Sequence, residues 1–434
     1  MDLGTVFECA TARDPDAVAI VDGGVRRSFA AWYDDIRTIA GGLKGLGLKG
    51  GDHLAAVMPN RFEMATLYWA CQLSGLIFTP YNWRARADEI AFVLADAGAK
   101  AVAFDDHTAQ AVREAASRAG LDHDALITVG EGGGGTPFAV LAQEAPVDGP
   151  AGADEREPCM MLYTSGTTGR PKGVPRSHRA ERVAAASCIA HQRYRLGESA
   201  LGVMPLFHTM GIRILLASMM LSGKFVCLPA FDGEAALGLI ENERITSLFL
   251  VPTMYHDMLN HPRFGDYDCT SVRNLGYAGM AMTGALEEKC RRLLNPEIFC
   301  NYYGSTEIFT FTVCDHLDRK PGCAGRAGLN QQIRVVAAEA DGGAGPDDRV
   351  AQGEFGEVIA SMSSPEAFQG YWKRPDADAR AIRDGWYFTG DLGTLDEDGE
   401  LTLAGRVDDM IISGGENIHP EEVEDILDAS PLVR

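Results

Sequence analysis

Two kinds of apolar segment alternate along this chain, and their alternation constrains the fold more than any other feature. Short apolar runs at 54–58, 76–79 and 101–104 have the length of buried strands. Between them, residues 62–73 and 89–97 carry apolar side chains at helical spacing. Strands that alternate with helices form right-handed βαβ units around a parallel sheet. We therefore predict such a lobe for the first part of the chain.

The same alternation resumes further along the chain. Helices are predicted at 181–191, 212–221 and 234–241, and strands at 200–204, 225–228 and 247–251. From about Cys323, short strands with glycine turns replace the helices, at 334–338, 356–361 and 401–403. The prediction is an α/β fold with one large domain, residues 1–407. It comprises two βα sheet lobes, 1–180 and 181–322, and a small β-rich lobe, 323–407.

Composition limits the class of protein. A chain of 434 residues that is 46% hydrophobic can bury a large core. Its 61 acidic and 39 basic residues give a formal charge of −22, which argues against nucleic acid and anionic membranes as partners. The ten cysteines include no C-x-x-C pair, which favours reduced thiols and no zinc site. No basic segment leads an apolar one at the start, and the longest apolar run, 214–221, is too short to span a bilayer. We expect a soluble, cytoplasmic protein, with the oligomeric state left open, a homodimer included.

A strand-like run at 159–163 leads into a loop, YTSGTTGRPKG at 163–173, whose residues suit phosphate binding. Its three glycines let backbone N–H groups approach an anion, and its hydroxyl groups add hydrogen bonds. Lys172 adds a mobile positive charge, and Pro171 stiffens the arm that carries it. The spacing differs from that of the common nucleotide-binding loop. A flexible linker is the alternative interpretation, but linkers rarely follow a buried strand or end in Pro-Lys-Gly.

Five further motifs follow this loop: PLFHTMG at 205–211, NYYGSTE at 301–307, GEFGE at 353–357, GWYFTGD at 385–391 and GRVDD at 405–409. With the loop, and in this order, they resemble the motifs of the adenylate-forming superfamily, which comprises acyl-CoA synthetases, adenylation domains of peptide synthetases and luciferases. The resemblance covers nearly the whole chain. His208 and the segment DDMIISGGENIHP at 408–420 are most similar to those of aryl-CoA ligases such as 4-chlorobenzoate:CoA ligase.

The resemblance implies an ATP site. In it, Tyr303 stacks on adenine, Asn301 lines the base pocket, Thr306 contacts the phosphates, and Asp391 and Arg406 hold the ribose. A carboxylate such as that of Asp391 can accept hydrogen bonds from two vicinal hydroxyls, although a turn aspartate is its ordinary role. The full implied set is Thr164, Ser165, Gly166, Thr167, Thr168, Gly169, Lys172, Gly279, Met280, Ala281, Asn301, Tyr302, Tyr303, Gly304, Ser305, Thr306, Asp391 and Arg406.

The resemblance also implies a metal role for Glu307, which by itself would be a surface glutamate. It would hold Mg²⁺, a hard cation that prefers oxygen ligands and bridges ATP phosphates. Lys172, His208, Thr306 and Glu307 are the residues to which the resemblance assigns catalysis.

A pocket for a carboxylic acid is implied by positions that are apolar, aromatic or small, and that leave room for a ring. They are Ala184, His208, Phe249, Ala278, Gly279, Tyr302, Ile308, Phe309 and Thr310. Each could equally be core packing. His208 resembles the residue that separates the acyl pocket from the nucleotide. Domains that activate amino acids carry an aspartate at the matching motif to pair the substrate's ammonium group, which a histidine cannot do.

Arg213 departs from the apolar character expected five residues beyond His208. One interpretation is a salt bridge between helices. The other is that it pairs a second carboxylate or another polar group of the substrate, which would favour a dicarboxylate.

The predicted reaction is that of an ATP-dependent carboxylic acid:CoA ligase, which forms acyl-AMP from an aromatic or other apolar acid and then transfers the acyl group to CoA. The sequence does not determine which acid is used. Two alternatives stay open. One is an adenylation domain that hands its acyl group to a carrier protein, and the other is a nucleotide-binding module that has lost its chemistry.

By resemblance, Asp408 is a hinge, and 408–434 is the incomplete start of an α+β C-terminal lid. The chain ends at Arg434, before the segment in which the family places a catalytic lysine. From this we expect that the chain binds ATP and its acid but forms acyl-AMP slowly.

Overall fold

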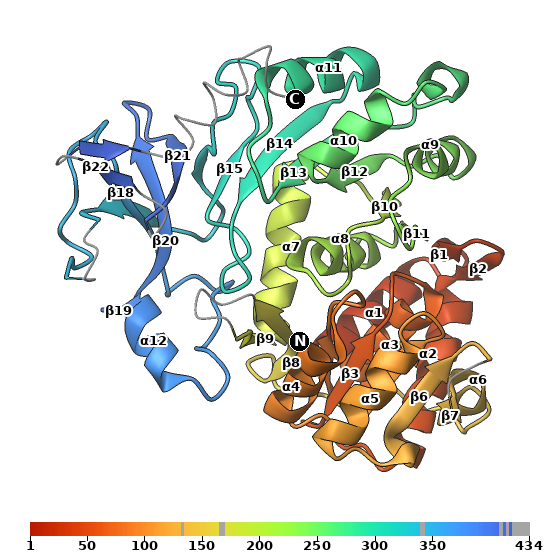
Figure 1. Ribbon diagram of the computed structural model, residues 1–434. Helices are drawn as coiled ribbons and strands as arrows, with labels where there is room; N and C mark the ends of the chain where they lie inside the picture. Colours follow the sequence, from red (N-terminus) through yellow and green to blue (C-terminus); the bar gives the residue numbers. More distant parts are fainter. Residues whose placement is uncertain (132–133, 165–169, 339–342, 408–410, 414–415, 419–434) are drawn as a thin grey trace.

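The computed structural model describes the chain except for residues 132–133, 165–169, 339–342, 408–410, 414–415 and 419–434. Its main elements are two large sheets covered by helices and a smaller antiparallel sheet (Figure 1). Among the described residues, none of the helices combines the length and apolar character needed to cross a membrane.

A seven-stranded sheet contains the first strand–helix units predicted from the sequence. Its strands follow the order β7-β6-β5-β3-β4-β8-β9, and all neighbours are parallel except β8 and β9. The strands are β3 (His53–Val57), β4 (Ile77–Pro80), β5 (Ala101–Asp105), β6 (Leu126–Val129), β7 (Thr136–Pro137), β8 (Pro158–Thr164) and β9 (Lys172–Ser177). Helices α4 (Ala87–Ala97) and α5 (Ala109–Ala119) pack on one face through residues such as Ile90, Leu94 and Val112.

A nine-stranded sheet follows the order β16-β15-β14-β13-β12-β10-β11-β1-β2. Its strands are β1 (Val18–Asp22), β2 (Val25–Ser28), β10 (Ser199–Gly202), β11 (Lys224–Cys227), β12 (Ser247–Leu250), β13 (Asn274–Ala278), β14 (Ile298–Tyr303), β15 (Thr312–Cys314) and β16 (Arg326–Ala327). The strands from β14 to β1 are parallel, and β2, β15 and β16 extend the edges antiparallel.

The membership of this sheet differs from chain order in two places. The early hairpin β1–β2 joins it through β11 rather than joining the seven-stranded sheet. Ala19, Ile20 and Val21 of β1 are all buried there. Strand β16 also belongs to it, although the sequence places residues after Cys323 in the small lobe.

The two large sheets and their helices form five layers: one layer of helices between the sheets and one on each outer face. Helices α1 (Leu3–Arg13), α2 (Phe29–Gly45), α3 (Phe62–Ser74), α7 (His178–Gln192) and α8 (Thr209–Met220) share one apolar core between the two large sheets. Helices α9 (Gly233–Asn242), α10 (Pro252–Leu259) and α11 (Gly284–Leu294) cover the far face of the nine-stranded sheet (Figure 1). Short helical segments occur at α6 (Phe138–Leu141), η1 (His123–Ala125) and η2 (Phe264–Asp266). The α/β class predicted from the alternation is confirmed.

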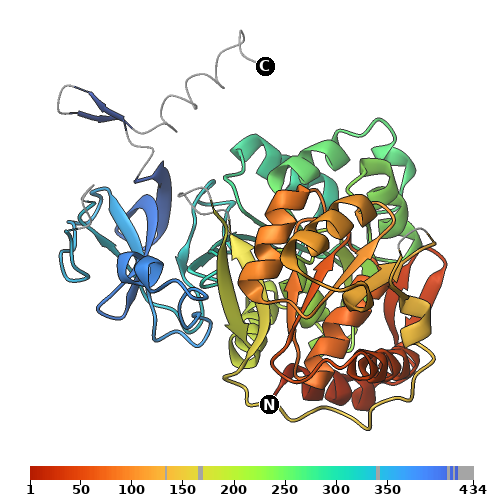
Figure 2. The same cartoon turned by 60° about the horizontal axis from the view of Figure 1, so that its bottom comes forward.

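The small sheet lies beside the two large ones (Figures 1 and 2). It pairs β17 (Ile333–Val336), β18 (Gly356–Ser361), β19 (Ile382–Arg383), β20 (Trp386–Leu395) and β21 (Leu401–Arg406), all antiparallel, with α12 (Pro375–Ala381) between β18 and β19. A further hairpin joins β22 (Ile411–Ser413) to β23 (Glu416–Ile418). The predicted hinge Asp408 and most of the predicted lid lie outside the described residues.

A buried carboxylate ties the small sheet to the nine-stranded sheet. Glu400, just before β21, is paired with His316 Nε2 at 2.9 Å, Lys320 Nζ at 3.1 Å and Arg326 Nη2 at 3.1 Å. These three side chains come from the segment that follows β15, so ion pairs as well as backbone hydrogen bonds hold the junction of the two sheets.

Candidate active site

Strands β8 and β9 carry the two ends of the predicted phosphate loop. Thr164 and Lys172 lie opposite each other in the antiparallel register, so the loop starts and ends at one edge of the sheet. Ser165, Gly166, Thr167, Thr168 and Gly169 lie outside the described residues. The half-buried Lys172 Nζ lies 4.3 Å from the centre of the Tyr371 ring. Burial lowers the pKa of Lys172, and the carboxylate of Glu307 opposes this shift.

Glu307 is fixed at both its side chain and its backbone. Its Oε1 accepts a hydrogen bond from Tyr371 Oη at 2.6 Å. Its carbonyl oxygen accepts one from Arg176 Nη1 at 2.8 Å and another from the Phe368 backbone N–H at 2.9 Å. Tyr371 therefore contacts both the predicted phosphate-binding lysine and the predicted metal-binding carboxylate.

Two buried arginines hold the segment that follows Glu307. Arg176, on β9, pairs with Glu181 at 2.8 Å, and the two side chains are 0% and 1% exposed. Arg213, on α8, donates from Nη2 to the Phe309 carbonyl oxygen at 2.5 Å. The Phe309 ring lies 4.0 Å from the Arg176 guanidinium carbon and 5.2 Å from that of Arg213. Both charges thus lie against one aromatic ring and one stretch of backbone.

Arg213 therefore does not form the salt bridge that one interpretation of the sequence predicted: within the described part of the chain, no acidic oxygen lies within 4.0 Å of it. Glu366 balances the local charge from further away. This residue is 1% exposed, and its surroundings include Arg213, Arg176 and the hydroxyls of Ser187 and Thr310. Burial raises the pKa of Glu366, and the two arginines oppose the shift.

The predicted ribose residues meet where β20 pairs with β21. Asp391 and Arg406 are partners in the register, and Arg406 Nη1 donates to Asp391 Oδ1 at 2.7 Å. Tyr303 Oη, at the end of β14, donates to Asp391 Oδ2 at 2.6 Å. Burial raises the pKa of Asp391, and its two partners oppose this. The structure thus brings together residues that are more than 80 positions apart in sequence.

The remaining predicted nucleotide residues lie at the carboxyl ends of β13 and β14. Gly279 has a φ of +90°, and Gly279, Met280 and Ala281 are exposed. Ser305 and Thr306 are partly buried. A Cβ at Gly304 would lie 2.1 Å from the Phe309 carbonyl oxygen, so only glycine fits there. Asn301 is buried, and its Nδ2 donates to the Cys323 carbonyl oxygen at 2.9 Å.

The predicted acid-pocket residues mostly gather on one face of the nine-stranded sheet. Ala184, Phe249, Tyr302 and Phe309 belong to the same apolar core, Ala278 packs against it, and Thr310 is buried. The Phe249 and Tyr302 rings have centres 5.1 Å apart. Ile308 is placed differently, because it packs with Val174 and Tyr371 in a separate core next to the small sheet.

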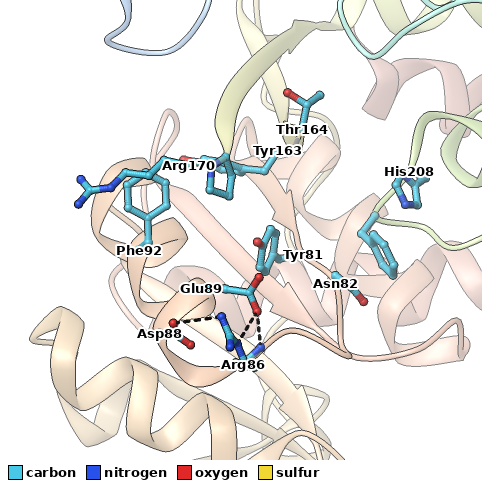
Figure 3. Close-up of a pocket in the computed structure, with 12 residues that line it drawn as sticks. Tyr81, Asn82, Arg86, Asp88, Glu89, Phe92, Tyr163, Thr164, Arg170 and His208 are labelled. Carbon is cyan, nitrogen blue, oxygen red and sulfur yellow. Dashed lines mark hydrogen bonds and ion pairs between the residues drawn. The ribbon is translucent and has the colours of Figure 1, made fainter. Parts of the chain in front are cut away.

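A surface pocket of about 740 Å³ opens beside the phosphate loop. Thr164 and His208 are the predicted site residues among those that line it, together with Tyr81, Tyr163 and Phe207. Figure 3 shows His208 on the side opposite Arg170 and Phe92. His208 keeps an exposed surface although it lines the pocket, and partial burial of its imidazole lowers its pKa.

Sequence reasoning missed Tyr371 and Arg176. No local pattern marks Tyr371, whose role depends on the packing of the small sheet against Glu307. Arg176 had a weak signal: an arginine near the end of a short strand, with Glu181 five residues later. In the described part of the chain, no group of three or more His, Cys, Asp or Glu residues could hold a metal ion.

The family model described as AMP-binding enzyme matches residues 7–372. The chain is 35% identical over 424 residues to feruloyl-CoA synthase from Amycolatopsis sp, covering 96% of this chain and 81% of that protein. It is 30% identical over 454 residues to 4-chlorobenzoate–CoA ligase from Arthrobacter sp, covering 99% and 81%. Among solved structures, Mycobacterium tuberculosis fatty acyl CoA synthetase matches with a TM-score of 0.84 and 29% identity, covering 99% of this chain and 83% of that one.

Proposed function

Because this chain belongs to the AMP-binding enzyme family, we propose that its site joins an aromatic carboxylic acid to AMP and then to CoA. The coarser activity needs no proposal: the chain is an ATP-dependent acid:CoA ligase of the AMP-forming class. The family predicted from the motifs, with its resemblance to aryl-CoA ligases, is likewise confirmed. The observation that carries the proposed site is the contact of Tyr371 with both Lys172 and Glu307.

The proposed nucleotide site surrounds the contact of Tyr371 with Lys172 and Glu307. Lys172 supplies a positive charge to the phosphates, and the Thr306 hydroxyl donates to them. Asp391 and Arg406 are proposed to hold the ribose, because their side chains already form a paired, half-buried donor and acceptor. Tyr303 joins this group through its hydroxyl, and its ring, one side of which packs on Phe311, is proposed to lie against the base.

The residues at Glu307 fit a magnesium ion. A hard cation that bridges phosphates needs only one or two protein oxygens, and Glu307 supplies a carboxylate next to the Thr306 hydroxyl. Tyr371 orients that carboxylate by donating to one of its oxygens. The remaining ligands would be phosphate oxygens and water. Bound there, the ion would neutralise charge on the phosphates.

The reaction is then mostly a matter of positioning. An oxygen of the substrate carboxylate attacks the α-phosphorus of ATP, and pyrophosphate leaves with the electron pair of the broken bond. The CoA thiolate next attacks the acyl carbon, and AMP leaves. Lys172 stabilises charge that develops on the phosphate, and the closely packed walls hold the acid in line. His208 lines the pocket beside the phosphate loop, where it can separate the acid from the nucleotide.

An aromatic acid is favoured over a dicarboxylate by the state of Arg213. Its guanidinium already donates to the Phe309 carbonyl oxygen and lies against the Phe309 and Tyr302 rings, with Glu366 nearby as a counter-charge. The predicted acid-pocket residues that share the apolar core near Arg213 include Ala184, Phe249 and Tyr302, which are small or aromatic and suit a ring. The names of the two ligase relatives, feruloyl-CoA synthase and 4-chlorobenzoate–CoA ligase, point the same way.

Pyrophosphate release across a panel of acids tests this proposal. Benzoates and cinnamates should be activated in preference to fatty and dicarboxylic acids, and CoA should be the acyl acceptor. Lys172→Met should slow the first step by about 10²–10³-fold, the cost of removing one positioned donor. Lys100→Met, at an exposed position, serves as the matched control. Preference for a dicarboxylate, transfer only to a carrier protein, or an unchanged Lys172→Met rate would contradict the proposal.

A further inference from the structure

Gln192, the last residue of α7, is fully buried, yet its amide is unpaired. Neither Nε2 nor Oε1 has a hydrogen-bond partner among the residues that the structure describes. Buried polar groups are nearly always paired, so an amide with two unpaired ends is a candidate for contact with a ligand.

The surroundings of Gly276 locate this amide. A Cβ at Gly276 would lie 2.4 Å from Gln192 Nε2 and 2.7 Å from Phe249 Cδ2. The amide of Gln192 and the phenyl ring of Phe249 therefore occupy the space that a side chain at position 276 would take. Phe249 and Gly276 are register partners in β12 and β13, and Ala278 and Tyr302 are partners two residues further along β13 and β14. Residues two apart share a face of a sheet, so all four face α7.

Helix α7 covers this face in a regular way. Ala184, Cys188 and Gln192 follow at intervals of four and thus form one stripe of the helix. Ala184 and Cys188 share their apolar core with Phe249 and Tyr302. The carboxyl ends of β13 and β14 lead to the nucleotide residues, whereas Gly276 lies further back along its strand. Gln192 is therefore at the inner end of the predicted acid pocket, away from the predicted nucleotide residues.

We propose that Gln192 is a specificity-determining residue that hydrogen-bonds a hydroxyl group on the distal end of the aromatic acid. A carboxamide offers a donor and an acceptor, and a hydroxyl offers the complementary pair. An acid without such a group would leave the amide buried and unpaired. The substrate class is thus a hydroxylated aromatic acid, and this inference rests on the proposed function.

Matched acids test it. Rates of pyrophosphate release are measured as kcat/KM for 4-hydroxybenzoate against benzoate and for 4-hydroxycinnamate against cinnamate. The wild-type protein should prefer each hydroxylated acid by about 5- to 150-fold, the range expected when a buried amide is left unpaired. Gln192→Met keeps the length and flexibility of the side chain but removes the amide, and it should abolish or reverse the preference without changing KM for ATP.

Gln72→Met is the matched control, because Gln72 is also a buried glutamine but lies on α3, where its Nε2 donates to the Cys159 carbonyl oxygen. This variant should keep the hydroxyl preference. Equal use of both members of each pair by the wild-type protein overturns the inference, and this comparison does not depend on any variant. A preference that survives in Gln192→Met overturns it as well. If no aromatic acid is activated and fatty or dicarboxylic acids are, the proposed function itself has failed.

Discussion

Glu181→Leu is expected to destabilise the protein by about 3–5 kcal/mol, because it leaves the Arg176 guanidinium buried without the carboxylate that contacts it. This loss of stability is larger than that expected for an exposed ion pair, because the Arg176 and Glu181 side chains are 0% and 1% exposed and their charged atoms lie 2.8 Å apart. Arg176→Met leaves the Glu181 carboxylate buried without its partner in the same way, and it should reduce the stability by a similar amount. Replacing both, Arg176→Met/Glu181→Leu, removes the stranded charge and leaves apolar side chains of similar volume. Stability should then return close to that of the wild-type protein.

Catalysis should not recover with stability in the double variant. Arg176 also donates to the Glu307 carbonyl oxygen at 2.8 Å, and this hydrogen bond is lost whenever the arginine is replaced. A hydrogen bond from a charged donor contributes about 1.5–3 kcal/mol, which corresponds to roughly 10- to 150-fold in rate if all of it serves to position Glu307. Glu181→Leu keeps this donor, so its rate should fall less than that of the double variant.

Urea-induced unfolding followed by tryptophan fluorescence measures the stabilities, and single-turnover pyrophosphate release measures the first chemical step. The control is Glu114→Leu on α5, which breaks the half-exposed ion pair with Arg118 and should cost no more than about 1 kcal/mol. Our reasoning is wrong if the buried single variants cost no more than this control. It is also wrong if the double variant regains its rate together with its stability.

Three further outcomes are expected. Asp391→Asn should weaken ATP binding measured by calorimetry while leaving the melting temperature nearly unchanged, because the amide keeps the shape but not the charge that pairs with Arg406; unchanged affinity would remove Asp391 from the ATP site. Ala278→Val should lower kcat/KM for the bulkier aromatic acids by roughly 10- to 200-fold with KM for ATP unaltered, since one or two methyl groups in an apolar pocket have effects of this size; an equal loss for all acids would argue against a pocket at Ala278. Asp315 and Glu400 raise the pKa of His316 above its usual 6.5, so the stabilisation by His316 should be complete below pH 6.5 and lost as pH rises through the folded-state pKa. The difference in melting temperature between wild type and His316→Asn should shrink accordingly, and a constant difference from pH 6 to 9 would contradict this.

The parts of the fold that local sequence determines were predictable. Residues 62–73 and 89–97 have helical periodicity and form α3 and α4, and the short apolar runs that alternate with them form β3, β4 and β5. The place of β1 in the nine-stranded sheet was not predictable. Its partner β11 lies some 200 residues later, and neither strand has a sequence pattern that identifies the other as its partner. Sheet membership is a property of long-range packing, not of local periodicity.

The same limit applies to the site. Motif order pointed to Asp391, Arg406 and Tyr303, and the structure places these three in contact. Whether they bind ribose stays a prediction. The contact made by Arg213 could not be predicted, because its hydrogen-bond acceptor is a backbone carbonyl. Every residue has such a carbonyl, so the sequence does not mark which one is used. Tyr371 was missed for a related reason, since its two contacts come from strands and loops that the chain reaches long before it.

The hairpin β1–β2 has a consequence for how this protein is made. It leaves the ribosome early, but the strand it pairs with, β11, begins at Lys224. At roughly 5–20 residues per second, β1 waits about 10–40 seconds with one apolar edge unpaired. During that interval the seven-stranded sheet can close around α2 and α3, while the open edge of β1 is exposed to other chains. Synthesis speed between residues 28 and 224, and any chaperone that covers this edge, should therefore affect the yield of folded protein more than the stability of the finished fold does.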